Sequence, residues 1–152
     1  MASGTQRRSR LLELGADYVV DRTENNIVDS VRQYTHGAGV DLVIDPVGTT
    51  LSASLSALAP EGRLVFVGNA GGGSLTVDLW SPMQSNQTLM GVFMGPLFER
   101  PAVRASVDDI LQAVAAGRIR VVIDRIFPLA NVAAAHEYAE TAKPLGRIVM
   151  EP

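Results

Sequence analysis

The sequence predicts an α/β domain built on a parallel β-sheet, and two observations support this fold class. Segments with the period of a helix alternate with short segments rich in β-branched residues, in the order strand, helix, strand, helix, strand. Strands that follow one another in this way pair in parallel through right-handed crossovers. The segment "RLVFVGN" is also apolar on both faces, which is typical of a strand covered by helices on both sides.

The first half of the chain is expected to hold four elements. "RRSRLLELG" has the leucine spacing of a helix and a glycine that ends it. "ADYVVD" follows as a short strand, and "NNIVDSVRQYTHGAG" has an apolar stripe at i, i+4 and i+7 and a glycine stop, which predicts a second helix. "VDLVIDPV" is the next strand.

The second half continues the alternation. "TTLSASLSALAPEG" predicts a helix with Pro-Glu-Gly as its exit turn, before the strand "RLVFVGN". "QTLMGVFMG" is expected to be a further strand, and "PAVRASVDDILQAVAAG" a helix with four inward residues: Val103, Val107, Ile110 and Val114. "IRVVIDRIFPL" and "GRIVM" are expected strands that flank a helix capped by Asn131.

Composition excludes several classes of function. The 152 residues are 47% hydrophobic and 19% charged, which favours a folded core over disorder. A net charge of -3 gives no reason to expect a nucleic-acid partner. No apolar run approaches the ~18 residues that span a bilayer, and the polar start does not resemble a signal peptide. With no cysteine in the chain, we expect a cytoplasmic protein without disulfides or thiolate chemistry.

A glycine-rich phosphate cradle, G-x-G-x-x-G, is missing. The two candidate glycine pairs would each need a third glycine, where Leu42 and Thr76 stand. The run "GGG" at 71–73 is interpreted as a flexible loop. There is no G-x-S-x-G, and neither His36 nor His136 has a histidine four residues away. His36 is expected at a helix end and His136 as a packed structural residue, so no catalytic or metal-binding residue is predicted.

Two features do suggest a ligand. Arg7 stands in the first turn of a helix, where a cation is mildly unfavourable, so it could bind an anion such as the 2′-phosphate of NADP. The alternative is a solvated basic patch. The turns at 46–48 and 68–69 both follow strands, and ligands of open parallel sheets lie at the carboxyl ends of strands. The alternative there is a pair of tight turns that merely suit glycine and proline.

Four segments together resemble one family: "LLELGADYVVD", "GVDLVIDPVG", "SLSALAPEGRLVFVGN" and "FPLANVAAAHEYAET…GRIVM". They are similar to the C-terminal part of the medium-chain dehydrogenase/reductases, in the zinc-free NADPH quinone oxidoreductase branch related to zeta-crystallin. The resemblance implies an incomplete Rossmann fold, a doubly wound parallel sheet without its first strands and their glycine-rich turn. It also implies a partial NAD(P)-binding domain at 1–120 and a segment at 121–152 that would return to a catalytic domain.

The resemblance assigns nine residues to the cofactor. Ser3 and Arg7 fall at the 2′-phosphate, and Arg22 stands where the family often has a tyrosine beside the adenosine. The other six lie on loops after strands, the first two near the adenine and ribose and the last four near the nicotinamide: Pro46, Val47, Val67, Gly68, Asn69 and Phe93.

Two functions are therefore expected to compete. One is a part of an NADPH-dependent oxidoreductase that transfers hydride to a quinone or an activated alkene or carbonyl. Without the cradle, this chain alone is expected to bind NADP weakly or not at all and to be inactive. The other is a non-catalytic α/β module that dimerises or binds a nucleotide weakly. Without the first strands, the segment at 16–21 has no neighbour, so we expect either a rearranged sheet or a homodimer whose partner covers the exposed edges. The resemblance implies that such a homodimer is joined through the strand near Met90–Met94.

Overall fold

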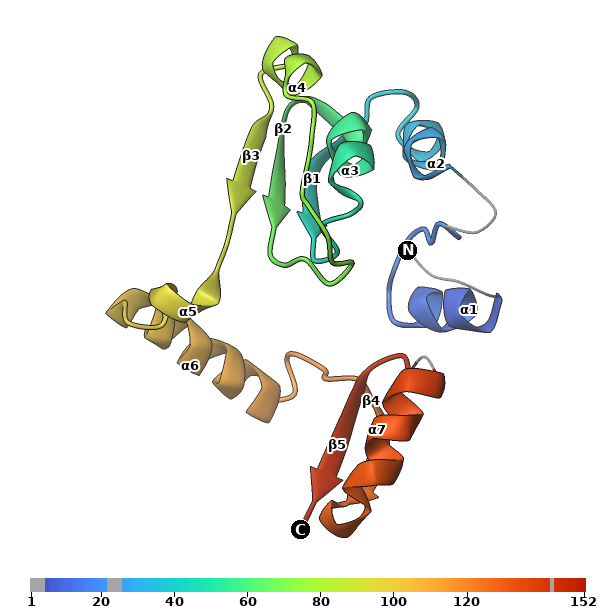
Figure 1. Cartoon of the computed structure of the whole chain (residues 1–152), viewed down its shortest axis with the longest axis vertical. Coiled ribbons are helices and arrows are strands. Elements are labelled where there is room, and N and C mark those ends of the chain that lie inside the picture. The colour runs from blue at the N-terminus through green and yellow to red at the C-terminus, as the bar shows by residue number, and fades with distance from the viewer. Residues whose placement is uncertain (1–4, 22–25, 143) are drawn as a thin grey trace. The chain divides into compact units, whose positions relative to one another are not determined.

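The computed structural model describes residues 5–21, 26–142 and 144–152 of the chain. Its contacts divide into two compact units, Met1–Met94 and Gly95–Pro152, which are described separately below. Figure 1 shows both. The division expected at residue 120 has a different basis, the resemblance of the last segment to a returning chain, and it stays a prediction.

The first unit is a parallel three-stranded sheet with helices that precede and connect its strands (Figure 1). The strand order is β1-β2-β3, and both neighbouring pairs are parallel. Its elements are α1 (Thr5–Glu13), α2 (Ile27–Tyr34), β1 (Val40–Asp45), α3 (Leu51–Ala57), β2 (Leu58–Phe66), α4 (Trp80–Gln84) and β3 (Thr88–Gly91), and α5 (Met94–Leu97) follows. The α/β class with parallel pairing is confirmed.

The core lies between α3 and one face of the sheet. Leucines from α3 and β2 are almost fully buried there: Leu51, Leu55, Leu58 and Leu64. They come together because the helix period and the strand period each bring apolar residues to a single face. On the described residues, the opposite face of β1 is open, and Ile44 is 64% exposed.

The expected strand at 16–21 does not form. Only Asp21 has a bridge partner, and the preceding residues have no regular structure. Tyr18 instead stacks on Tyr34 of α2, with 4.1 Å between ring centroids. A strand needs a neighbour for its N–H and C=O groups, and no strand in the described part of the chain pairs along this segment.

The expected exit turn Pro-Glu-Gly also proves to be different. These residues lie inside β2, where the register with β1 jumps from Val40 opposite Leu58 to Leu42 opposite Arg63. The extra residues form a bulge, and Glu61 adopts a positive φ of 61° in it. The helix therefore passes into the strand without a separate turn.

The second unit pairs two parallel strands beside a helix. Its elements after α5 are α6 (Pro101–Ala115), β4 (Ile123–Pro128), a 3-10 turn η1 (Leu129–Asn131), α7 (Val132–Thr141) and β5 (Arg147–Glu151). Asn131 stands at the start of α7 as expected, but its side chain makes no capping hydrogen bond. The expected inward position of Ile110 is wrong in this structure, because Ile110 is 53% exposed and α6 has no extensive contact with another described element.

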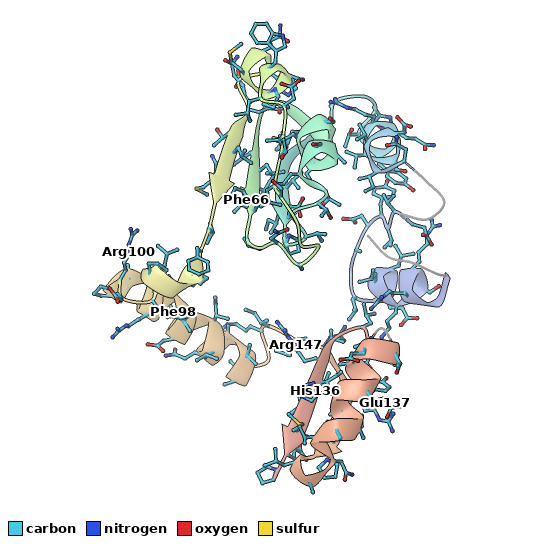
Figure 2. The ribbon with its side chains drawn as sticks, viewed as in Figure 1. Phe66, Phe98, Arg100, His136, Glu137 and Arg147 are labelled. Atoms are coloured by element: carbon cyan, nitrogen blue, oxygen red, sulfur yellow. The ribbon has the colours of Figure 1, made fainter. Side chains whose placement is uncertain are left out.

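His136 and Glu137 are consecutive residues of α7, and both are labelled in Figure 2. His136 is exposed, so the expectation of a packed histidine is wrong. The buried position on this helix is Ala135. His36 lies just beyond the end of α2, as expected, with a φ of 51°.

Candidate functional site

The candidate site is the edge of the first unit's sheet at which all three strands end. In the register, Asp45 stands opposite Phe66, and Phe66 stands opposite Gly91. The pattern continues one step further, because the Val67 N–H donates to the Asp45 carbonyl at 2.9 Å and the Val92 N–H to the Phe66 carbonyl at 3.0 Å. The chain therefore leaves all three strands at the same edge, which is where parallel sheets bind ligands.

Six of the nine expected cofactor residues follow these strand ends directly. They are the residues Pro46, Val47, Val67, Gly68, Asn69 and Phe93. Two of their apolar members are open to solvent, since Val67 is 45% and Phe93 80% exposed, while Val47 is partly buried. This edge of the sheet thus combines exposed apolar side chains with polar groups of the backbone and of an amide side chain. The roles of the six residues toward a cofactor remain predictions.

Asp45, the last residue of β1, organises the first loop. One carboxylate oxygen, Oδ1, accepts hydrogen bonds from the N–H groups of Val47 at 2.8 Å and Gly48 at 3.0 Å. The other, Oδ2, accepts from the hydroxyls of Thr50 at 2.7 Å and Ser54 at 2.8 Å. The residue is only 3% exposed, so these four donors replace water around the charge.

These contacts control the ionisation of Asp45. Burial raises the pKa of its carboxyl, while the hydrogen bonds from Thr50, Gly48, Ser54 and Val47 lower it, and the net result is a pKa below the ordinary 3.8. The carboxylate is therefore ionised at neutral pH. Sequence reasoning did not single out Asp45, although an aspartate before Pro-x-Gly, with hydroxyl residues following, was the available signal.

This lowered pKa predicts a pH dependence of stability. A carboxyl whose pKa is lowered in the folded state stabilises it fully above the unfolded pKa, and the contribution is lost as pH falls through the folded pKa. The difference in free energy of unfolding between the wild type and Asp45→Asn should thus be largest near about pH 6 and shrink below about pH 4. Urea unfolding across this range measures it, and a difference that stays constant with pH would contradict the assignment.

A second loop, residues 67–73, packs directly on the first. The Gly71 N–H donates to the Val47 carbonyl at 2.8 Å and the Ala70 N–H to the Pro46 carbonyl at 3.3 Å. Asn69 closes this loop on itself, because its Nδ2 donates to the Gly73 carbonyl at 2.9 Å. The two loops at the ends of β1 and β2 therefore form one connected structure.

Glycine is needed where the loops meet. A Cβ on Gly48, whose φ is +82°, would lie 2.7 Å from Asn69 Oδ1, and one on Gly71 would lie 2.6 Å from Thr49 Oγ1. Gly68 has the Pro46 carbonyl oxygen 3.2 Å from the same position. These glycines let the loops approach each other, whereas Gly72 and Gly73 have open space around the position of a Cβ.

The other three expected cofactor residues are not gathered at this edge by any described contact. Arg7 lies on α1, is partly buried, and has an interaction within the chain. α1 has no contact with the sheet comparable to that of α3. Ser3 and Arg22 lie outside the described residues.

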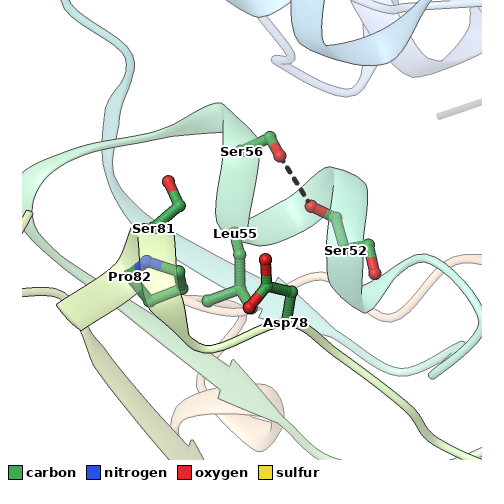
Figure 3. Close-up of a pocket in the computed structure, with 6 residues that line it drawn as sticks. All are labelled: Ser52, Leu55, Ser56, Asp78, Ser81 and Pro82. Atoms are coloured by element: carbon green, nitrogen blue, oxygen red, sulfur yellow. Dashed lines mark hydrogen bonds between the residues drawn. The ribbon is translucent and has the colours of Figure 1, made fainter. Parts of the chain in front are cut away.

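A small pocket lies elsewhere in the first unit, between α3 and α4 (Figure 3). Its volume is about 150 Å³, and its lining consists of Ser52, Leu55, Ser56, Asp78, Ser81 and Pro82. Two of its polar groups are already engaged. The Ser56 hydroxyl donates to the Ser52 carbonyl at 2.9 Å, and Asp78 Oδ1 accepts from the Trp80 N–H, also at 2.9 Å. The lining thus contains no nucleophile paired with a base.

Among the described residues, no group of three or more histidine, cysteine, aspartate or glutamate side chains could hold a metal ion. The same part of the chain has no helix that is long and apolar enough to cross a membrane.

Comparison with known proteins identifies the family. The chain matches the family model described as zinc-binding dehydrogenase over residues 14–150. It belongs to this family. Within it, the chain corresponds to the C-terminal portion of medium-chain dehydrogenase/reductases of the quinone oxidoreductase branch. The family is an oxidoreductase family that depends on a nicotinamide cofactor.

Individual members of the dehydrogenase family show the extent of the likeness. A 2-haloacrylate reductase from a Burkholderia species is 31% identical, over 92% of this chain and 43% of that protein. A quinone oxidoreductase from Pseudomonas aeruginosa is 30% identical, over 91% of this chain and 43% of that protein. The solved structure of a mycobacterial quinone oxidoreductase superposes with a TM-score of 0.80 and 30% identity, over 99% of this chain and 47% of that one. The chain thus spans less than half the length of these relatives.

The residues present do not fit the zinc ion that the family description names. Structural and catalytic zinc sites use cysteine, histidine and carboxylate ligands. The chain has no cysteine, and its described residues contain no suitable cluster of the other types. The fit to a nicotinamide dinucleotide is better but partial. The strand-end edge offers exposed apolar surface and an amide, while the sequence contains no G-x-G-x-x-G for the pyrophosphate.

Proposed function

We propose that this chain forms the nicotinamide-facing part of a zinc-free, cytoplasmic, NADPH-dependent oxidoreductase that reduces a quinone or an activated alkene or carbonyl. The alignment of three strand ends at one edge supports the proposal most directly, since it gathers six expected cofactor residues on two connected loops and the end of β3. The relatives named quinone oxidoreductase and 2-haloacrylate reductase support the type of substrate.

In this proposal the chain holds the cofactor and contributes no catalytic side chain. NADPH would supply the hydride. The exposed side chains of Val67 and Phe93 would flank the nicotinamide ring, and the main chain at Gly68 and the Asn69 side-chain amide would orient its carboxamide. Pro46 and Val47 would lie along the adenine and ribose.

The adenosine end would be bound through charge. Arg7, with Ser3, would contact the 2′-phosphate, and Arg22 would stand beside the adenosine. An arginine bonded to a phosphate distinguishes NADPH from NADH. The pyrophosphate has no cradle in this sequence, so the chain by itself is proposed to bind NADPH weakly and to turn nothing over.

NADPH titration followed by fluorescence tests this proposal. For the 152-residue chain we expect a dissociation constant for NADPH above about 1 mM, which is the upper end of the usual range of KM values of enzymes. Arg7→Ala should weaken NADPH binding by about tenfold, the effect of losing a charged hydrogen bond, and leave NADH binding unchanged. Arg8→Ala, one residue away and exposed, is the matched control.

Two results would overturn the proposal. One is tight binding, or quinone-dependent oxidation of NADPH, by this chain alone. The other is a loss of affinity in Arg7→Ala that is equal for NADPH and NADH, because that loss could not come from the 2′-phosphate.

A second candidate function is a dimerising α/β module, and the outer strand of the sheet favours it. Among the described strands, β3 pairs with β2 alone, so its other side presents backbone groups that no described strand pairs with. Met90 on this strand is 45% exposed and Phe93 just after it is 80% exposed. We propose that two copies pair through the strand near Met90–Met94, which would cover both features.

The size of the chain in solution tests this pairing. Sedimentation should give a dimer for the wild type, and Met90→Lys should shift it toward monomer, because a lysine on an edge strand opposes pairing. Met83→Lys is the control, since Met83 is 58% exposed and lies on α4. A wild type that is monomeric at all concentrations, or a Met90→Lys variant that stays as dimeric as Met83→Lys, would refute the interface.

A further inference from the structure

We propose that Asp45 is the positioning residue of the strand-end edge: its carboxylate sets the shape of the loop at 46–50 and, through that loop, of the loop at 67–73. The relevance of this arrangement to a cofactor rests on the function proposed above. Asp45 would touch neither cofactor nor substrate, and it would act through Val47 and Gly48.

The Asp45 carboxylate is bonded directly to the main chain of the loop that follows it. The Asp45 carboxylate accepts four hydrogen bonds from the loop after β1 and from the start of α3. The donors are Val47, Gly48, Thr50 and Ser54. Two of these donors are backbone N–H groups in the loop itself, so the carboxylate directly determines the path of the main chain there. Because Asp45 is only 3% exposed, water is poorly placed to replace it when the carboxylate is removed.

The loop at 46–50 is in turn bonded to the loop at 67–73. The carbonyls of Pro46 and Val47 accept the N–H groups of Ala70 and Gly71. Gly48, held by Asp45, also packs so closely on Asn69 that a Cβ would have no room. A change in the path of residues 46–48 is therefore expected to move residues 69–71, which include Asn69 and directly follow Gly68 on the proposed nicotinamide side.

The attachment of α3 to the sheet does not depend on Asp45 alone. This helix is attached to the sheet by Leu51 and Leu55, which are each 4% exposed in the core. Its N-cap residue, Thr50, makes no capping hydrogen bond with its side chain, and the Thr50 hydroxyl donates to Asp45. Two of the four bonds to Asp45 come from main-chain N–H groups of the loop, whereas only the bond from Ser54 comes from within α3.

Two-dimensional amide NMR of the full chain tests the inference with four variants. Asp45→Ala removes the acceptor. Asp45→Asn is the conservative variant, because its amide oxygen can keep the two N–H donors while its NH₂ group donates to the two hydroxyl oxygens. Ser54→Ala removes one of the four bonds in a helix-compatible way, which keeps the test informative if Asp45→Ala fails to fold. Val43→Ala, two residues earlier on β1 and packed on the core, controls for a general loss of stability.

Hydrogen exchange supplies the first measurement. Asp45→Ala should speed exchange at the amides of Val47, Gly48 and Gly71 by at least about tenfold relative to Val43→Ala, a difference that reports local opening. Asp45→Asn should stay within about threefold of the wild type, and Ser54→Ala should fall between them. If Asp45→Ala, or Ser54→Ala in its place, changes these amides no more than Val43→Ala does, the inference is wrong.

NADPH-induced shifts of the same amides supply the second measurement. The initial slope of shift against NADPH concentration should fall by about fivefold or more in Asp45→Ala and be restored in Asp45→Asn, as expected when the site is preformed by the loop. An unchanged slope in a variant whose loops have opened would overturn the link between the loops and cofactor binding. A wild type whose loop amides do not respond even at NADPH concentrations well above about 1 mM would refute the proposed function, while the exchange result would still decide the role of Asp45.

Discussion

Replacing Gly39 by alanine is expected to lower the free energy of unfolding by about 2–5 kcal/mol, from left-handed backbone strain together with forced overpacking. Gly39 precedes β1 and has a φ of +87°. An added Cβ would lie 2.7 Å from the Ala59 nitrogen and 2.8 Å from the Ala57 carbonyl oxygen. Both contacts are with main chain at the junction of α3 and β2, which cannot move aside as a flexible side chain would.

Gly37→Ala is the matched control for this substitution. Gly37 has a φ of +90°, close to that of Gly39, but nothing lies within 4 Å of the position of its Cβ. It should therefore show only the strain, about 1–2 kcal/mol. Urea unfolding followed by circular dichroism gives both values. Equal losses in the two variants would mean that the close approach at Gly39 relaxes without cost.

Leu64→Ala is expected to destabilise the first unit by about 2–5 kcal/mol, the usual cost of removing a buried leucine side chain and leaving a cavity. Leu64 lies in the middle of β2 and is 0% exposed. It contributes to the same small cluster as Leu51, Leu55 and Leu58. With so few fully buried side chains, the loss of one removes a large share of the core.

Met83→Ala supplies the comparison at an exposed apolar position. Met83 is 58% exposed on α4, and its truncation should change the free energy of unfolding by no more than about 0.5 kcal/mol. The same urea unfolding experiment measures both variants. If Leu64→Ala costs no more than Met83→Ala, the cluster around α3 does not form the core of this unit.

Much of the fold could be predicted because the relevant signals are local. The apolar period of "NNIVDSVRQYTHGAG" predicted α2, and the alternation of helical and β-branched segments predicted the parallel order of β1 and β2. Local pattern failed at 16–21, where the residues favour a strand but only Asp21 finds a bridge partner. A strand depends on its neighbour as well as on its own residues, and for this reason β-propensity alone was misleading there.

The candidate site divides in the same way. That 46–48 and 68–69 would both follow strand ends was visible in the sequence, because each follows a segment with the residues of a buried strand. The Asp-Pro-x-Gly sequence with hydroxyl residues after it indicates a turn at Asp45, but it does not show that the carboxylate would be buried with four donors. Burial depends on how α3 packs over the end of β1, and packing is a property of the assembled elements.

Residue patterns alone were therefore enough to predict the class of fold, the order of most of its elements and the loops at which a cofactor would be sought. These follow from residue periodicity and from turn residues, which act over a few neighbouring positions. Packing between distant parts of the chain set three further features: the three strands end in register, the loops at 46–50 and 67–73 bond to each other, and Gly48 and Gly71 lie where these loops approach most closely. The physical reason is that these contacts join residues more than twenty positions apart in the chain, whose closeness depends on sheet pairing and on the shared core beneath α3.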